Sequence, residues 1–466
     1  MSAARTRRGL LATTVVAVVA ALLVVVLGEP SSVAQQRAAA VQQRTVAAFG
    51  FERAHAGWSA GNTTTRLDRV RSGHAGSRYA ARLRPPVGRG ATVELTDSKA
   101  FVRGTDRAET FRVTVWVRTP SPSVRAKLLV RERRNAHTVA SSWDTTWLGS
   151  RTWRPLTVRY TMRSTSSVLD IRVIGENLRS GQSLLVDDVR GLHSPLPTVT
   201  PRLLGRTNFG KTVYNPNTSW DDAVRRADKK YGRLDIIRVF YPGFPTSWPG
   251  PAGSINRPVP VSFRIAPNAV LAGNYDDALR RWFKDAPRDR TIWWTYMHEP
   301  EDDIEGGQYS ATAYRAAWRH INQIAAAVDK PNLRPTLTLM CWTLSPNSGR
   351  SFSDYYPGNF IKTFAWDCYN QSWWDGRYRK PADMVKQAAS FSHRHGKGFA
   401  IAELGTRLLP GDDGTGRAAW LIGVAKAAAR VNAQYVSYFD TEVSGGDFRL
   451  NDLPSQMAWR RVIRAS

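Results

Sequence analysis

Short runs of alternating apolar and polar residues fill the first part of the chain beyond its N-terminus. The segments FRVTVWV (111–117) and LTVRY (156–160) alternate with a period of two, the pattern of a strand with one buried and one exposed face. Turn residues separate these runs, and no long helical period interrupts them. Residues 46–193 are therefore predicted to form an antiparallel, all-β sandwich.

The pattern changes after a proline-rich stretch, 194–201, which indicates a short linker. From there, apolar runs typical of strands alternate with runs that have helical spacing. The predicted strands are 203–208, 234–241, 259–265, 292–299, 336–341, 364–370, 399–403 and 434–439. Eight strands separated by helices or loops are the expected content of a (β/α)8 barrel, so residues 202–466 are predicted to form an α/β domain of this type.

Helix signals stand between several of these strands. A capping-box-like start lies at Ser219, and residues 314–325 carry apolar side chains at helical spacing. Residues 380–395 and 416–432 are two further predicted helices. The segment 242–258 is the exception, because it is rich in Gly and Pro and favours a loop.

The first 34 residues (1–34) have the pattern of an export signal. Three arginines precede an apolar run from Leu10 to Leu27, and small residues at Ser32 and Ala34 suit a signal peptidase. The apolar run is also nearly long enough to span a bilayer, so an uncleaved anchor is the alternative to cleavage near Ala34. In either case we expect the rest of the protein outside the cytoplasm, secreted or held at the outer face of the membrane.

The charge balance is strongly basic, with 66 Lys and Arg against 38 Asp and Glu and a formal net charge of +28. Such a surface attracts nucleic acid, anionic lipid or an acidic polymer. The basic residues are scattered, and no nucleic-acid-binding module accompanies them, so we expect no nucleic-acid partner. Membrane contact is expected only through the N-terminal segment, and we expect a monomer.

Two cysteines, Cys341 and Cys368, exclude a disulfide scaffold and a multi-cysteine metal site. They fall near the ends of adjacent predicted strands, and an extracellular compartment permits a disulfide. Because a bridge between adjacent strands demands specific geometry, the sequence leaves their pairing open.

Two predicted barrel strands end in a glutamate. Glu299 closes the aromatic run 291–299 and is followed by Pro300, and Glu403 closes the run 398–403. The two lie 104 residues apart, and C-terminal strand tips face the active site of such a barrel. Two carboxylates across a barrel mouth suit glycoside hydrolysis, in which one protonates the leaving oxygen and the other attacks or activates water.

In these residues the barrel resembles clan A glycoside hydrolases, and family 26, the endo-β-mannanases and their relatives, most closely. His298-Glu299 is similar to that family's acid/base segment, and Glu403 to its nucleophile. Tyr369 resembles the tyrosine that hydrogen-bonds the nucleophile, and Arg238 stands where these enzymes often keep an arginine near it. The resemblance implies a retaining endo-β-glycanase that requires no cofactor for catalysis.

Two departures from the family 26 pattern bear on mannan specificity and leave the two glutamates in place. The third predicted strand, 259–265, carries no histidine. An acidic segment, 300–308, replaces the aromatic-rich loop that usually follows the acid/base. We expect it to be a flexible, solvated loop that contains Glu301, Asp302, Asp303 and Glu305.

The proposed chemistry demands opposite protonation of the two glutamates. Glu299 must be protonated near neutral pH, and burial among the aromatic residues 293–296 is expected to raise its pKa. Glu403 must stay ionised, which Arg238 and Tyr369 would favour. A separation of ~5–5.5 Å between the two carboxyl groups is expected for retention of configuration.

Further residues are candidates for substrate binding. His298 is expected to orient Glu299 or a sugar hydroxyl. Several tryptophans lie near the tips of the fifth and sixth predicted strands and are candidates for stacking on sugar rings, with core packing as the alternative for any one of them. They are Trp342, Trp366, Trp373 and Trp374.

The sandwich resembles the carbohydrate-binding jelly-roll modules that are appended to polysaccharide hydrolases. The resemblance rests on a Phe-Glu pair at 51–52, a Gly-Trp pair at 57–58 and an Asp-Asp-Val closing strand at 185–191. It implies a structural Ca2+ ion with the candidate ligands Glu52, Asp187 and Asp188, while solvated acids at a plain sheet edge are the alternative. The candidates for sugar stacking here are Trp143, Trp147 and Trp153, with core packing as the alternative for any one of them.

The sequence thus predicts an exported, retaining hydrolase of a β-linked polysaccharide, mannan-like or another β-glycan, with an accessory carbohydrate-binding sandwich. The alternative is a non-catalytic barrel that binds a surface polysaccharide or helps to assemble an exopolysaccharide. A third hypothesis is that the basic surface recruits an acidic polymer of the cell envelope.

Overall fold

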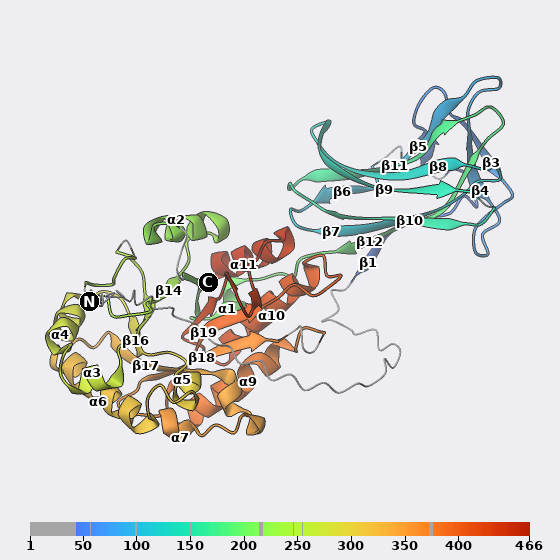
Figure 1. The fold of residues 1–466 in the computed structure, drawn as a ribbon. Coiled ribbons are helices and arrows are strands. Elements are labelled where there is room, and N and C mark those ends of the chain that lie inside the picture. Colours follow the sequence, from blue (N-terminus) through green and yellow to red (C-terminus); the bar gives the residue numbers. More distant parts are fainter. Residues whose placement is uncertain are drawn as a thin grey trace, which may run out of the picture.

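Two domains follow each other along the chain (Figure 1). The structure is a computed structural model that describes residues 43–55, 57–97, 100–149, 151–213, 218–245, 247–253, 255–371 and 376–466. The predicted export segment, 1–34, lies outside these ranges. Within them, no helix is both long enough and apolar enough to cross a membrane.

The N-terminal domain is the predicted β-sandwich. One antiparallel sheet has the order β10-β7-β12-β4-β3, with β1 paired to β12, and the other the order β2-β5-β11-β8-β9, with β6 paired to β11. The first sheet consists of β1 (Arg44–Phe49), β3 (Arg66–Val70), β4 (Ala80–Arg84), β7 (Thr110–Arg118), β10 (Arg154–Thr161) and β12 (Leu184–Ser194). The second consists of β2 (Trp58–Ala60), β5 (Ala91–Asp97), β6 (Val102–Thr105), β8 (Val124–Arg134), β9 (His137–Leu148) and β11 (Ser167–Leu178).

The C-terminal domain is a closed barrel of eight parallel strands in chain order, as predicted. They are β13 (Asn208–Val213), β14 (Ile236–Phe240), β15 (Val259–Phe263), β16 (Ile292–Tyr296), β17 (Leu333–Met340), β18 (Thr363–Asn370), β19 (Gly398–Thr406) and β20 (Tyr435–Tyr438). A small hairpin of β21 (Glu442–Val443) and β22 (Gly446–Asp447) follows the last strand.

Helices surround the barrel strands (Figure 1). They are α1 (Pro201–Leu204), α2 (Trp220–Tyr231), α3 (Pro267–Leu271), α4 (Asp276–Asp285), α5 (Glu301–Glu305), α6 (Ala311–Ala327), α7 (Phe352–Tyr355), α9 (Pro381–Arg394), α10 (Thr415–Arg430) and α11 (Leu453–Ala465). Two 3-10 turns, η1 (Cys341–Leu344) and η2 (Pro346–Ser348), follow β17. The described residues of 242–258 contain no helix, in line with their Gly and Pro content.

The first predicted barrel strand, 203–208, is wrong in position. The chain forms the short helix α1 there, and β13 begins only at Asn208. Pro201 suits the first position of a helix, because its missing N–H would have no helical partner there. Leu204 is fully buried, so its apolar character comes from core packing rather than from a strand.

The barrel strands are buried on both faces, which explains their nearly continuous apolar runs. Successive residues of β16 point to opposite sides. Trp294 packs outward against Trp318 of α6, with ring centroids 5.0 Å apart. Trp293 belongs to a separate buried cluster with Tyr435, at 4.8 Å. This alternation places Trp294 on the helix-facing side of the strand and Trp293 on its other side.

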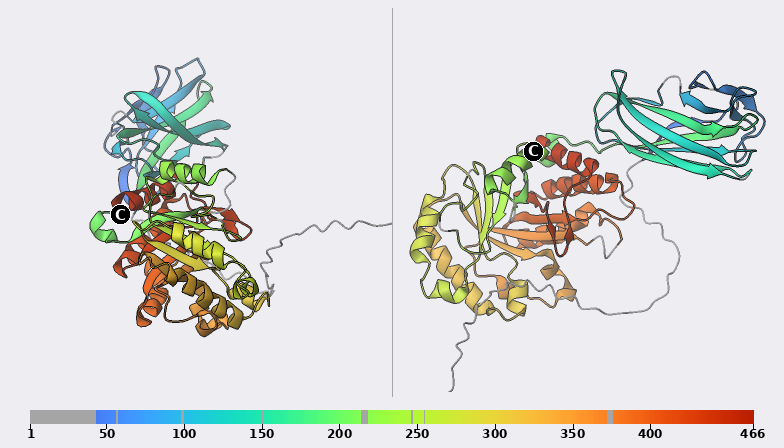
Figure 2. Two further views of the ribbon diagram at one scale, coloured as in Figure 1. Left: turned by 90° about the vertical axis from the view of Figure 1, so that its left-hand side faces the viewer. Right: turned by 45° about the horizontal axis from the view of Figure 1, so that its top comes forward.

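The sandwich lies on the side of the barrel that carries α10 and α11 (Figures 1 and 2). Side chains of both helices hold the linker between the domains: Lys426 donates to the carbonyl of Thr198 at 2.8 Å, and Arg461 to that of Leu196 at 3.1 Å. Arg159 of β10 donates directly to the carbonyl of Gly411 in the barrel at 3.0 Å. The linker is therefore bound along the barrel surface.

Candidate active site

The candidate catalytic residues come from strands on different sides of the barrel. Arg238 lies on β14, Glu299 follows β16, Tyr369 lies on β18 and Glu403 on β19. Parallel strands place their carboxyl ends at one mouth of a barrel, so these side chains meet at that mouth. Three of them are joined directly by hydrogen bonds.

Glu403 accepts a hydrogen bond on each carboxyl oxygen. Nη1 of Arg238 donates to Oε1 at 2.5 Å, and the hydroxyl of Tyr369 donates to Oε2. Both Arg238 and Glu403 are buried. Burial, and then the negative charge of Glu403, raises the pKa of Tyr369, so this phenol is a neutral donor. A cation and a phenol on opposite oxygens hold Glu403 in one orientation.

Gly405 makes room for the tyrosine. Tyr369 and Gly405 are register partners on the neighbouring strands β18 and β19. A Cβ atom at residue 405 would lie 2.6 Å from the ring of Tyr369, closer than carbon atoms can approach. The glycine in the Ala402-Glu-Leu-Gly405 segment is therefore a requirement of the Tyr369–Glu403 hydrogen bond.

Glu299 stands on a strained backbone turn. The strand β16 ends at Tyr296 rather than at Glu299, because Met297 and Glu299 both adopt left-handed backbone angles, with φ of 47° and 49°. The amide of Glu299 donates to the carbonyl of Thr338 at 3.1 Å, which ties the turn to β17. Non-glycine residues in this conformation cost of order 1–3 kcal/mol each and concentrate at functional sites.

The pKa of Glu299 is raised to about 8. Burial is the largest cause, followed by the negative charges of Glu403 and Glu301, while Arg238 opposes the shift. The raised pKa and its leading cause, burial, are both as expected. The structure adds two acidic neighbours, whose charges disfavour ionisation of a third carboxyl group.

His298 is a buried, neutral partner of β15. Its Nδ1 lies 3.1 Å from Oγ of Ser262, and its ring packs against Phe240 at 4.6 Å. Burial, and then the positive charges of Arg238 and Arg264, holds the pKa of His298 well below its ordinary value. Ser262 lies in the strand segment that carries no histidine, and nothing in the sequence pattern pointed to it.

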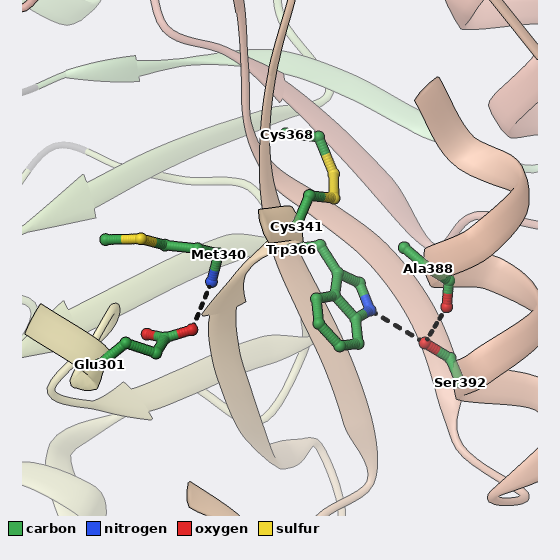
Figure 3. Close-up of a disulfide and its surroundings, with 7 residues drawn as sticks. All are labelled: Glu301, Met340, Cys341, Trp366, Cys368, Ala388 and Ser392. Atoms are coloured by element: carbon green, nitrogen blue, oxygen red, sulfur yellow. Dashed lines mark hydrogen bonds between the residues drawn. A yellow bond between two sulfur atoms is a disulfide. The ribbon is translucent and has the colours of Figure 1, made fainter. Parts of the chain in front are cut away.

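Two buried acids near the site were not predicted as site residues. Burial, and then the charge of Glu403, raises the pKa of Asp367 well above its ordinary value, and its carboxylate lies 3.9 Å from Nη2 of Arg238. Glu301 is fully buried and accepts a hydrogen bond from the amide of Met340 at 2.8 Å (Figure 3). It also accepts one from Oγ1 of Thr343 at 2.6 Å. Burial raises the pKa of Glu301 to about 7.

The acidic segment after Pro300 was expected to be a solvated loop, but it is helical and buries Glu301, while Asp302 and Glu305 are exposed as expected. It forms the short helix α5, and arginines from distant parts of the chain pair with its acids. Arg350 pairs with Asp302 and Glu305, and Arg264 pairs with Asp303. The helix was not predicted because its compensating cations are distant in sequence. Arg350 lies 45 residues after Glu305, and Arg264 lies in the preceding βα unit.

The candidate stacking residues differ in their surroundings. Trp342 is 47% exposed on η1, next to the disulfide that joins Cys341 to Cys368. Trp366 is a core residue that donates to Oγ of Ser392 at 3.0 Å (Figure 3). Trp373 and Trp374 lie outside the described residues, so Trp342 is the described candidate that a ligand can reach.

The calcium candidates of the sandwich are engaged by protein groups. Oε1 of Glu52 accepts from Oγ of Ser77 and from two backbone amides, and Asp188 pairs with Arg190. Asp187 is fully buried, its Oδ2 accepts from the amide of His74 at 2.8 Å, and its Oδ1 has no hydrogen-bond partner among the described residues. Within the described residues, no group of three His, Cys, Asp or Glu side chains is arranged to hold a metal ion. The calcium site stays a prediction.

Solved structures with similar folds include two glycoside hydrolases. The CBM22-1 and GH10 modules of a Clostridium thermocellum endo-1,4-beta-D-xylanase, complexed with xylohexaose, cover 90% of this chain and 97% of their own, with 13% identity and a TM-score of 0.38. An arabinose-bound GH51 α-L-arabinofuranosidase covers 88% of this chain and 75% of its own, with 13% identity and a TM-score of 0.27.

The xylan-binding CBM22-1 domain of Paenibacillus barcinonensis Xyn10C covers 33% of this chain and 97% of its own, with 16% identity and a TM-score of 0.27. No protein-family model and no curated protein matches the sequence. Likenesses at these identities and TM-scores say nothing about the substrate or the reaction of this chain.

Proposed function

We propose that the protein is an exported, retaining glycoside hydrolase that cleaves a β-linked polysaccharide, with Glu299 as acid/base and Glu403 as nucleophile. One observation carries the proposal: the pKa of Glu299 is raised, so that Glu299 keeps its proton near neutral pH, and the charge of nearby Glu403 contributes to this shift. Glu403 is meanwhile bound by Arg238 and Tyr369. Retaining hydrolysis needs this pair of unlike carboxyl groups.

In the first step, an oxygen of Glu403 attacks the anomeric carbon while Glu299 gives its proton to the leaving glycosidic oxygen. The glycosidic bond breaks and an ester between Glu403 and the sugar forms. Arg238 and Tyr369 hold the attacking carboxylate in place, so little of its freedom has to be lost in the transition state.

The electrostatics of the pair also prepare the second step. The charge of Glu403 is one of the causes that raise the pKa of Glu299, and this charge disappears when Glu403 becomes an ester. The pKa of Glu299 then falls, which suits its new role as a base. Glu299 takes a proton from water, the water oxygen bonds to the anomeric carbon, and Glu403 leaves as a carboxylate.

We further propose family 26-like, endo-acting hydrolysis of a mannan-like or other β-glycan. The support is the order and spacing of Arg238, His298-Glu299, Tyr369 and Glu403 along the chain. Export is supported by the apolar segment before residue 34.

The test is a panel of β-mannan, mixed-linkage β-glucan, xylan and acidic capsule-like polymers, with reducing ends as the readout. We expect Glu299→Gln and Glu403→Gln each to lower kcat/KM on the active polymer at least ~10³-fold. NMR of the first products is expected to show the β-anomer. Activity that survives both substitutions would sink the assignment, and binding to a polymer without turnover would favour the non-catalytic alternative.

A further inference from the structure

Two tryptophans stand exposed on the sandwich. Trp143 is 58% and Trp147 66% exposed, whereas most large aromatic side chains of the described residues are buried. Both lie on β9, an edge strand of the second sheet. They are four residues apart, so they project from the same face at a spacing of about 13 Å. Exposed apolar patches rimmed by polar residues mark interaction sites or ligand-binding grooves.

The neighbouring strand β8 supplies cations to this face. Register pairs Trp143 with Leu129 and Trp147 with Arg125, which places Lys127 between the two indoles. Nζ of Lys127 lies 4.9 Å from the centre of the Trp143 ring, and among the described residues this ammonium group makes no hydrogen bond or ion pair. Its charge is therefore available to a ligand that stacks on the indole.

The face also carries carboxylates in ion pairs with arginine. Arg125 pairs with Glu176 at 3.2 Å, and Arg131 with Asp170 at 2.8 Å. Such pairs offer both donors and acceptors to a ligand that has hydroxyl groups. They suit a polymer of hydroxylated rings with spaced charges better than a nucleic acid, whose closely spaced phosphates the carboxylates would repel.

The net charge of the protein is concentrated in this domain. Residues 43–193 contain 26 Lys and Arg against 12 Asp and Glu, a formal net charge of +14. Residues 202–466 contain 36 against 25, a net charge of +11 in a longer segment. The excess positive charge per residue in the sandwich is about twice that of the barrel, and it attracts a polyanion at long range.

We propose that the face of β8 and β9 around Trp143, Trp147 and Lys127 binds a polysaccharide whose sugar rings carry acidic groups. The rings stack on the two indoles, and the acidic groups pair with Lys127 and with the exposed edge of Arg125. The inference rests on the proposed function in one respect. Under that function the hydrolase acts on the polymer that the sandwich binds, so its substrate is an acidic rather than a neutral polysaccharide.

Binding is measured on the full chain carrying Glu299→Gln and Glu403→Gln, so that no ligand is consumed. The probes are a polyuronate, a sulfated polysaccharide, a neutral β-mannan and single-stranded DNA, each across a series of salt concentrations. We expect tighter binding to an acidic polysaccharide than to mannan or DNA, with affinity that falls as salt rises. The uronate and sulfate arms distinguish the two sources of negative charge.

Three variants locate the site. We expect Trp143→Ala with Trp147→Ala to raise Kd for the acidic polysaccharide about tenfold or more, and Lys127→Gln to raise it less and to flatten its salt dependence. Arg89→Gln and Arg151→Gln remove exposed charges elsewhere on the sandwich and are the matched controls, with Kd expected to change less than about twofold. An unchanged melting temperature in each variant shows that the fold is retained.

The inference is overturned if the tryptophan double variant binds as the parent does, if mannan binds as tightly as the acidic polymers, or if DNA binds more tightly than either. Its failure can be told apart from that of the proposed function. In the active enzyme, the same tryptophan variant is expected to hydrolyse a short soluble substrate at the parental rate, so binding and hydrolysis are scored separately.

Discussion

At the scale of single residues, the influence of Glu301 on the pKa of the acid/base Glu299 can be tested by mutation. The charge of Glu301 is one of the causes that raise the pKa of Glu299 to about 8, so Glu301→Gln should lower the pKa of Glu299. Glu299 must be protonated to act, and activity is lost as pH rises through its pKa. We therefore expect the alkaline limb of the kcat/KM profile to lie near pH 8 in the parent and to move to lower pH in the variant.

Glu305 provides the control for this shift. It lies on the same short helix as Glu301, but at its exposed end, paired with Arg350. We expect Glu305→Gln to leave the alkaline limb where it is. If Glu301→Gln left the limb unmoved, or if both variants moved it equally, the specific influence of Glu301 on Glu299 would be disproved.

The hydrogen bond from Tyr369 is a second residue-scale prediction. Tyr369→Phe removes a donor from the attacking carboxylate, and we expect kcat to fall on the order of 10²-fold with KM little changed. Gly405→Ala should have a similar effect, because its Cβ would displace the same ring. Steady-state kinetics on the active polymer give both values. Tyr356→Phe is the control, because the hydroxyl of Tyr356 donates to Asn359 at 3.3 Å and not to Glu403. A Tyr369→Phe enzyme with parental kcat would contradict the prediction.

How far the site could be predicted also depends on single residues. Arg238, Tyr369 and Glu403 stand on strands that the pattern of apolar runs already located, and Glu299 follows three residues after the end of such a strand. The partners of Ser262 and Asp367 come from other parts of the barrel. No sequence pattern around a serine or aspartate inside a strand identifies such a partner. The aromatic cluster before Glu299 was a poor guide, because alternate residues of β16 face opposite sides of the sheet.

At the scale of elements, buried strands were predictable and charged segments were not. Barrel strands are buried on both faces, so their apolar runs identify them without any knowledge of their neighbours. The helix α5 has the opposite character. Its acids fold into a helix because Arg264 and Arg350 approach from elsewhere, and Glu301 is buried because Met340 and Thr343 supply donors. Such long-range compensation cannot be read from a local pattern.

The disulfide between Cys341 and Cys368 gives an element-scale prediction. It joins η1 to β18 across 27 residues of sequence, and closing a loop of this length stabilises a folded protein by about 3.5 kcal/mol in the chain-entropy model. We expect Cys341→Ala with Cys368→Ala to lower the free energy of unfolding in urea by this order. Because Trp342 adjoins Cys341, KM is expected to rise more than kcat falls.

Reduction is the matching control for that measurement. A reductant should destabilise the parent and leave the double variant unaffected, because the variant has no disulfide to lose. Equal urea midpoints for the parent and the variant without reductant would show that η1 is held by its other contacts alone.

At the scale of the whole molecule, the buried acids should make stability depend on pH. Glu299 and Glu301 have ordinary pKa values of 4.5 in an unfolded chain and about 8 and about 7 in the folded protein. Below pH 4.5 both states hold these protons, and they contribute nothing to the pH dependence. Above it the unfolded chain releases protons that the folded chain keeps, so the free energy of unfolding falls as pH rises towards 8.

We expect Glu299→Gln to flatten this decline, because a glutamine cannot ionise in either state. Thermal unfolding of the parent and the variant at pH 5, 6.5 and 8 measures the effect. The variant should gain stability over the parent as pH rises, by several degrees in melting temperature at pH 8. A difference that stays constant, or one that shrinks with pH, would contradict the raised pKa of Glu299.

The bound linker sets a geometric limit on how the two domains share a polymer. Lys426 and Arg461 bind the carbonyls of Thr198 and Leu196, so the linker does not leave the sandwich free to move relative to the barrel. A polysaccharide that is bound at Trp143 and Trp147 and hydrolysed at Glu299 would span a constant distance between the two sites. The protein would then act as a molecular ruler, and we expect early digests to be enriched in fragments of one preferred length. Loosening the linker with Lys426→Ala and Arg461→Ala should broaden that distribution without changing the bond that is cut.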